Sequence, residues 1–107
     1  MSEFVDYLPE TFSTFGAISI RKMFGGHGVY HEGIMIGLIA DDMLYLKTDK
    51  QSEQAFIALE LPQFKYPKAN KFVGMSYYQA PAEALEDPDE MCHWAQLAFD
   101  AALRSRK

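Results

Sequence analysis

The sequence has very little cysteine. Cys92 is the only one among 107 residues, so the chain cannot form an internal disulfide. Disulfide-free chains are typical of reducing compartments. The first ten residues are acidic and lack the apolar run that a signal peptide requires. We therefore expect a cytoplasmic protein.

Long hydrophobic runs are also missing. The longest covers residues 34–40 and is interrupted by Gly37. A helix that spans a bilayer needs about 20 consecutive apolar residues. We expect no segment that crosses a membrane.

Basic residues are outnumbered, with 10 Lys and Arg against 15 Asp and Glu and a formal net charge of −5. An acidic surface repels phosphate at long range. Non-specific binding to nucleic acid is therefore disfavoured, unless the basic residues gather on one face.

Apolar residues are plentiful by contrast, at 49% of the chain with 14% aromatic, which is ample for a folded core. A chain of 107 residues matches the size of one domain, because a second would have no core of its own. We expect a single folded domain over residues 1–107.

Three apolar runs follow one another between residues 18 and 47, separated by glycines and by an Asp-Asp pair. Runs of this kind are typical of antiparallel strands joined by tight turns. The pair Gly25-Gly26 lies inside the first run, where it favours a bulge or bend. We expect one bent strand over residues 18–31 and two further strands over residues 34–40 and 43–48.

The last of these strands alternates clearly. Leu44 and Leu46 fall on one side, and Met43, Tyr45 and Lys47 on the other. We expect the leucine side to belong to the core, and the other side to be partly covered or wet.

Helical patterns lie before and after this meander. A first helix is expected over residues 3–15, with Pro9 inside it and Gly16 after its end, and a second over residues 50–59. Asp87 and Pro88 mark the start of a final helix. Strands are expected over residues 64–66 and 71–78. The order α-β-β-β-α-β-β-α predicts an α+β fold with an antiparallel sheet.

The glycine-rich stretch at residues 24–28, FGGHG, suggests a phosphate-binding loop at first sight. Such loops lead from a strand into a helix, whereas both flanks here are strand-like. A structural bulge is favoured, and a small-molecule site using His27 and Tyr30 stays open as an alternative. His27 and His31 would lie about 13 Å apart in an extended strand, too far to share a metal ion.

Other pairs of reactive residues also favour structure over chemistry. Cys92 and His93 are neighbours on a helix and point about 100° apart, with no third residue to orient them. Asp41 and Asp42 between two apolar strands are typical of a solvated turn. We expect no catalytic residues, no metal ligands and no cofactor, and thus a protein that is not an enzyme.

Residues 61–78 hold three basic residues and no acidic one. Basic side chains beside aromatic rings can hold a nucleic-acid strand through phosphate contacts and base stacking. A protein-binding surface and a purely structural role are the other two interpretations. The candidate partner or nucleic-acid surface consists of Lys65, Tyr66, Lys68, Lys71, Tyr77 and Tyr78.

Several segments, in order along the whole chain, resemble the N-terminal domain family of TfoX, also called Sxy. The resembling segments include residues 38–42, 44–47 and 75–78, together with Trp94 and Ala98. The fingerprint near the start of the meander is Arg21, Lys22, Met23, Phe24, Gly25, Gly26, Gly28 and Tyr30.

This resemblance implies an α+β fold like that of type III secretion chaperones, and a regulatory role. The full-length regulator of natural competence acts with the cyclic-AMP receptor protein and carries a second, C-terminal domain. We expect a stand-alone, single-domain member with a protein partner, such as a transcription factor. Direct nucleic-acid binding is the alternative, and self-association through the sheet edges stays open.

Overall fold

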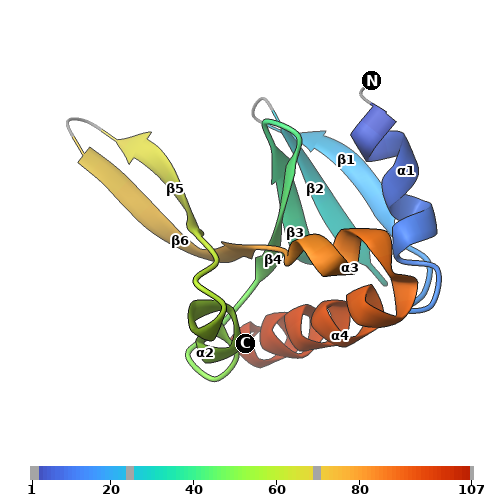
Figure 1. Ribbon diagram of the computed structural model, residues 1–107. Coiled ribbons are helices and arrows are strands. Elements are labelled where there is room, and N and C mark those ends of the chain that lie inside the picture. The colour runs from blue at the N-terminus through green and yellow to red at the C-terminus, as the bar shows by residue number, and fades with distance from the viewer. Residues whose placement is uncertain (1–2, 24–25, 69–70, 107) are drawn as a thin grey trace.

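The computed structural model describes residues 3–23, 26–68 and 71–106, with the side chains of residues 66–74 outside that description. Figure 1 shows one curved sheet with helices along one side and below it. In chain order the elements are α1 (Glu3–Thr11), β1 (Ser19–Met23), β2 (Gly26–His31), β3 (Ile34–Ala40), β4 (Met43–Lys47), α2 (Glu53–Ala58), β5 (Gln63–Lys68), β6 (Lys71–Gln79), α3 (Ala82–Glu86) and α4 (Pro88–Ser105).

The sheet has six strands in the order β1-β2-β3-β4-β6-β5, and every neighbouring pair is antiparallel. Two of its turns are very tight, because both Glu32 and Gly33 have positive φ, as have Asp41 and Asp42. This geometry suits two-residue hairpins in a twisted sheet. The α+β class with an antiparallel sheet, expected from the sequence, is confirmed.

The number of strands corrects the sequence prediction. Residues 18–31 do not form one bent strand, because β1 and β2 are separate and antiparallel, with Met23 paired to Gly26. The chain thus reverses direction between Met23 and Gly26. The bulge lies further along instead, where the register between β2 and β3 shifts after Val29.

The starts of the first and last helices agree with the prediction, whereas the start of the second and the lengths of the first two do not. Asp87 accepts a hydrogen bond from the backbone N–H of Asp89 at 2.9 Å and caps α4 as expected. Gly16 takes a positive φ, also as expected. The first helix ends at Thr11 and not at residue 15, and the second covers only Glu53–Ala58.

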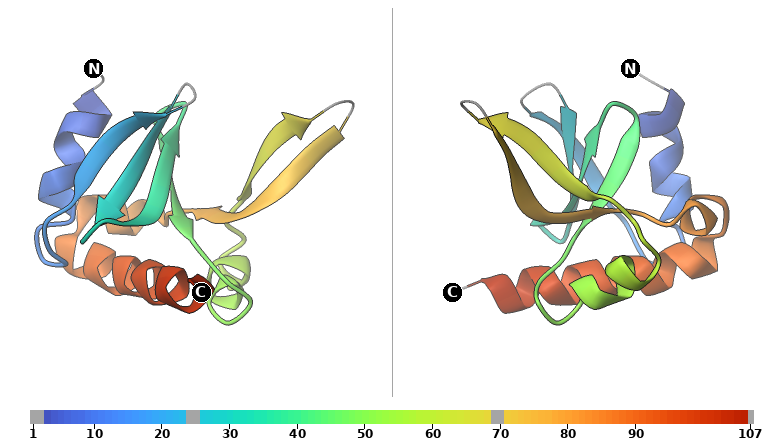
Figure 2. Two further views of the ribbon diagram at one scale, coloured as in Figure 1. Left: turned by 180° about the vertical axis from the view of Figure 1, so that it is seen from behind. Right: turned by 60° about the vertical axis from the view of Figure 1, so that its left-hand side comes forward.

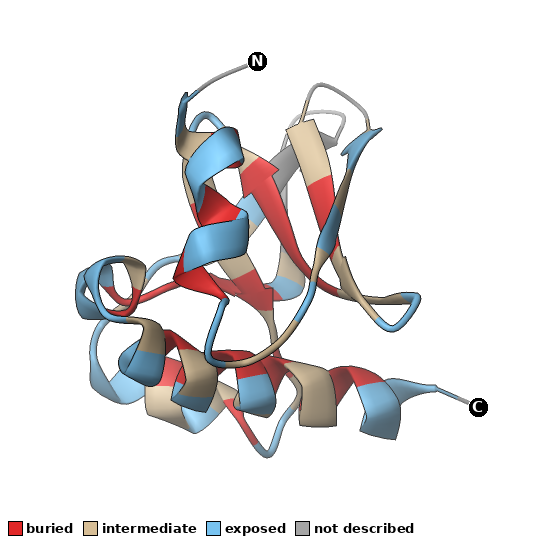
Figure 3. Ribbon diagram, turned by 90° about the vertical axis from the view of Figure 1, so that its right-hand side faces the viewer, coloured by how far each residue is buried: buried red, intermediate tan, exposed pale blue. Residues whose placement is uncertain are grey.

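One face of the sheet is packed against α1 and α4 (Figure 2), and the main core lies between these layers. Buried positions on α1 and α4 turn toward the strands in Figure 3. The largest fully buried side chains include Leu8 and Phe12 from the N-terminal part, Leu44 and Leu46 from β4, and Phe56 from α2.

The strands β5 and β6 project from the body as a two-stranded arm, visible in Figures 1 and 2. Only Tyr77, Tyr78 and Gln79 of β6 pair with β4, while the pairing with β5 continues to Lys71. We call residues 63–68 with 71–76 the β5–β6 arm.

An ion pair ties the segment before α2 to the end of α4. The guanidinium of Arg104 donates to both carboxylate oxygens of Asp49, at 2.6 Å and 3.1 Å. This hydrogen bonding lowers the pKa of Asp49 well below its usual range. None of the helices in the described residues has the length and apolar character needed to cross a bilayer.

Candidate functional site

The side of the sheet opposite the main core forms the candidate site. A row of paired positions crosses five strands on this side, from Arg21 through Gly28, Leu38 and Tyr45 to Gln79. Paired residues in antiparallel strands share a face, so these side chains point the same way. We call this surface the outer face, and its larger side chains are Arg21, Met23, Tyr30, Met35, Leu38, Tyr45, Lys47, Phe64 and Tyr77.

At the β1–β2 end, the Tyr30 ring lies over Gly28. A Cβ added to Gly28 would come within 2.9 Å of both Tyr30 Cε1 and Met23 Sδ. The guanidinium carbon of Arg21 lies 5.1 Å from the centroid of the Tyr30 ring, within cation–π range. The absence of a side chain at Gly28 thus creates the space that this stacked group occupies.

At the β4–β6 end, a second aromatic group forms across strands. The rings of Tyr45 and Phe64 meet edge to face, with centroids 5.0 Å apart. The Lys47 ammonium lies 5.2 Å from the centroid of the Tyr77 ring. Each end of the outer face therefore pairs a cation with a tyrosine.

The two groups approach each other over the middle of the sheet. Burial raises the pKa of Tyr77, and the nearby Tyr30 raises it further, although two strands separate β2 from β6. Tyr77 is only 8% exposed and Leu38 only 9%, and neither belongs to the main core. The outer face therefore has buried positions of its own, apart from the main core.

Charge is divided between the strands and the rest of the chain. None of the 15 acidic residues falls within the six described strands, whereas six of the 10 basic residues do. The acidic residues occupy the helices, turns and connections instead. The six strand positions are Arg21, Lys22, Lys47, Lys65, Lys68 and Lys71.

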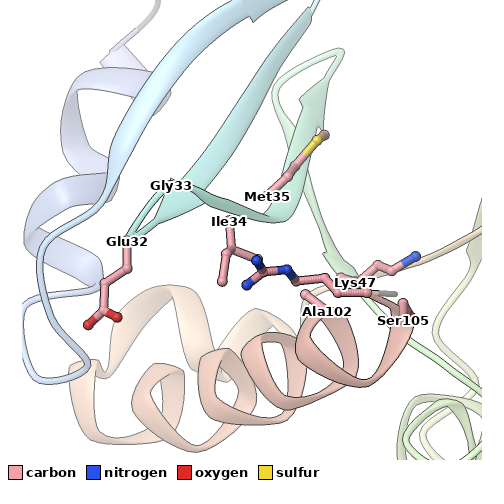
Figure 4. A pocket seen from close by; sticks show the side chains of 8 residues that line it. Glu32, Gly33, Ile34, Met35, Lys47, Ala102 and Ser105 are labelled. Atoms are coloured by element: carbon pink, nitrogen blue, oxygen red, sulfur yellow. The ribbon is translucent and has the colours of Figure 1, made fainter.

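A pocket of about 400 Å³ opens at the lower rim of the outer face, between the β2–β3 turn, β4 and the end of α4 (Figure 4). Met35 and Lys47 join it to the outer face, and Ala102, Ser105 and Arg106 line it from the helix side. Figure 4 shows Glu32 and Lys47 pointing in opposite directions. The helix dipole at the end of α4 disfavours a free anion here, so the two cations do not by themselves make an anion site.

Comparison with known proteins agrees with the resemblance drawn from the sequence. Residues 10–102 match the family described as the TfoX N-terminal domain. The chain belongs to this family. A curated relative, the DNA transformation protein TfoX1 of Aliivibrio fischeri (strain ATCC 700601 / ES114), is 25% identical over 107 residues, which cover 96% of this chain and 51% of that protein. The chain thus spans about half the length of the relative that it matches.

The TfoX fingerprint residues largely converge on the outer face. Arg21, Met23, Gly28 and Tyr30 form the stacked group described above, while Lys22 belongs to the opposite side of β1. Gly26 has a different role, since a Cβ there would lie 2.2 Å from the backbone oxygen of Ile39, so the β2–β3 contact requires glycine. Phe24 and Gly25 lie outside the described residues.

The basic and aromatic surface expected on residues 65–78 needs correction. Tyr77 and Tyr78 are each only 8% exposed, and Tyr78 packs into the main core against Phe56. They are therefore not free to stack on a ligand. Lys65 is exposed on β5. The side chains of Tyr66, Lys68 and Lys71 lie outside the described residues.

For the small-molecule site considered at FGGHG, the described residues His27 and Tyr30 do not come together on one face. His27 pairs with Ile39 on the core side of β2, whereas Tyr30 lies over Gly28 on the outer face. His31 is committed to packing, because its Nδ1 lies 2.8 Å from the Ala17 oxygen and its ring contacts Phe15.

The sequence did not single out Met35 and Leu38, which complete the outer face. The signal for Tyr45 and Lys47 was present in the alternation of β4, which placed them opposite Leu44 and Leu46. The β2–β3 bulge hid the equivalent pattern in β3, where four successive residues are buried.

Proposed function

We propose that this chain is a non-catalytic regulatory domain that binds a partner protein on its outer face. One observation carries the proposal. Half-exposed tyrosine, phenylalanine and methionine side chains lie there with two cations, on a side of the sheet that α1 and α4 do not cover.

The composition of the outer face fits a protein interface. Aromatic residues, methionine and arginine are enriched in interface cores, and acidic residues are depleted. Tyr30, Tyr45 and Phe64 are neither buried nor fully exposed, so each offers apolar area that a partner could still cover. Tyrosine and arginine are also the side chains most often found as binding hot spots.

The biological setting follows from the family. The Aliivibrio fischeri relative is a DNA transformation protein, and we extend a role in regulating DNA uptake to this chain. The proposed partner is a transcription factor, and the proposed location is the cytoplasm.

Tyr45→Ala tests the docking surface, with Tyr7→Ala as the matched control. Tyr45 lies on the outer face, whereas Tyr7 is 51% exposed on α1. We expect Tyr45→Ala to weaken capture of the partner by about tenfold or more, because a hot-spot tyrosine contributes above about 1.4 kcal/mol. Quantitative affinity capture from the native host, followed by transformation assays of the two variants, measures this.

Equal capture and equal transformation in both variants would contradict the proposal, provided that both remain folded. Thermal unfolding of the purified proteins supplies that check. If only Tyr7→Ala weakens capture of the partner, the docking surface lies on α1 and not on the outer face.

Direct binding of nucleic acid through the β5–β6 arm is the second candidate. It is favoured by the projection of the arm and by the three lysines and no acidic residue in residues 61–78. Two-stranded ribbons enter the grooves of DNA in several protein families.

The salt dependence of DNA binding tests this second candidate. Lys65→Ala should lower affinity for duplex DNA and reduce the slope of log affinity against log salt by about one, since one phosphate contact is lost. Lys50→Ala, an exposed position outside the strands, serves as the control. A protein that shows no salt-dependent shift with duplex or single-stranded DNA would rule this candidate out.

A further inference from the structure

Within the described residues, neither cation of the outer face forms an ion pair with a carboxylate. Arg21 and Lys47 each lie over a tyrosine ring. Within the described part of the chain, Arg104 pairs with Asp49, and His31 Nε2 lies 3.5 Å from Glu32, so neither contact involves Arg21 or Lys47. A cation on an aromatic ring keeps its charge available to a further anionic group.

The distribution of charge gives the strands and the helices opposite preferences. The helices and connections hold all 15 acidic residues, while the strands hold six basic ones. A negatively charged partner would be repelled by α1 and α3 and attracted to the strands. Such complementarity steers association and fixes orientation.

The pocket at the rim adds a place for one carboxylate. Lys47 and Arg106 line it together with the apolar side chains of Ile34 and Met35. Glu32 also lines it, from the β2–β3 turn, and points away from Lys47 (Figure 4). A free anion would be repelled by the partial negative charge at the C-terminal end of α4. A carboxylate on a segment that is already bound to the outer face enters the pocket as a second, intramolecular contact, so it needs less affinity of its own. The recess therefore suits an acidic side chain flanked by apolar ones.

We propose that the occupant of the outer face is an acidic segment of the partner protein. Its carboxylates lie beside Arg21 and Lys47, and its apolar side chains cover Tyr30 and Tyr45. This inference rests on the proposed function and names the chemistry of the partner that the outer face selects.

Selection from a library of short random peptides, displayed on phage and panned against the folded domain, tests this inference. The enriched peptides should carry an excess of Asp and Glu beside Leu or Phe. Their binding should shift the backbone amide resonances of Leu38 and Tyr45, which lie in paired positions on β3 and β4.

Two variants on β1 then distinguish a direct contact between a cation and the peptide from a general effect of net charge. Arg21→Gln should weaken the enriched peptides about tenfold, the loss expected for a charge contact at an interface. Lys22→Gln removes the same charge from the neighbouring position on the other side of β1 and should change affinity by less than about twofold. Equal losses in the two variants would overturn the inference.

The remaining outcomes distinguish this inference from the proposal on which it rests. Enriched peptides that are neutral or basic and still shift the Tyr45 resonance would overturn the acidic partner and leave protein binding in place. Failure to recover any peptide that shifts that resonance would contradict both. If duplex DNA, and no peptide, shifts the Tyr45 resonance, the outer face binds nucleic acid and not a protein segment.

Discussion

The two faces of this sheet are made by alternate residues of the same strands, yet they differ in chemistry. On β4, Leu44 and Leu46 point into the main core and are almost fully buried, whereas Tyr45 and Lys47 point to the outer face and are half-buried. The core face is covered by α1 and α4, and the outer face is closed only by its own side chains.

The difference shows how one strand serves stability and recognition together. Leucine contributes apolar area only, and this is most stabilising where water is fully excluded. Tyrosine and lysine combine an apolar body with a polar end, so they remain compatible with water until a partner covers them. Residues of the outer face can therefore be replaced at lower cost to folding than residues of the core.

One truncation in the main core and one on the outer face test this difference with the largest expected effect. Phe56 is fully buried, with its ring centroid 4.9 Å from that of Trp94. Phe56→Ala should lower the free energy of unfolding by about 3–5 kcal/mol, through lost burial and the cavity left behind. Tyr45→Ala should cost about 1 kcal/mol. Urea denaturation, followed by the fluorescence of Trp94, measures both. Equal losses would show that the outer face is a second structural core.

A smaller effect is expected where the outer face is tightly packed. Gly28→Ala places a methyl group against the Tyr30 ring and should destabilise the fold by about 1–3 kcal/mol, as overpacking does. If the ring is the cause, combining Gly28→Ala with Tyr30→Ala should cost less than the sum of the two single changes. Denaturation of the four proteins gives the coupling energy.

Strictly additive losses would mean that Gly28 is required for a reason other than the Tyr30 ring. The Gly26→Ala variant provides the contrast. There the added Cβ would meet the Ile39 backbone oxygen, which no side-chain truncation can relieve.

The sequence predicted the fold class because local signals were unambiguous at several elements. The alternation of residues 43–47 separated the two faces, and Asp87 located the start of α4. The glycine pair misled, since Gly25-Gly26 is compatible with a bulge and with a chain reversal, and apolar residues continue on both sides of it. Only the pairing of Met23 with Gly26 distinguishes the two.

The candidate site was harder to predict, because it depends on which strands become neighbours. Tyr77 and Tyr78 are adjacent in the sequence, and both were assigned to one surface. The fold turns Tyr78 into the main core and Tyr77 toward Lys47 on the outer face. Half of the basic residues on the strands stood out in the sequence, because residues 61–78 hold three lysines and no acidic residue. The others, Arg21, Lys22 and Lys47, join them only when the strands pair, and a net charge of −5 does not reveal this.

Tyr77 and Tyr78 provide the last comparison of the two faces, and the smallest expected effect on stability. Burial raises the pKa of both hydroxyls, and Glu53 raises that of Tyr78 further. In the unfolded chain, a tyrosine hydroxyl ionises near pH 10. The stability that each neutral, buried hydroxyl contributes is therefore complete below about pH 10, and it is lost as the pH rises through the raised pKa of the folded state. At pH 7, Tyr77→Phe and Tyr78→Phe should each change the free energy of unfolding by no more than about 1 kcal/mol.

Above about pH 10, each Phe variant should lose less stability than the wild type, because it lacks one hydroxyl whose ionisation favours unfolding. Denaturation at neutral and alkaline pH compares the three proteins. A reduced loss for Tyr78→Phe alone would show that water reaches Tyr77 freely. The outer face would then admit water at Tyr77, although that side chain is only 8% exposed. The two faces of the sheet would differ in water access more than their packing indicates.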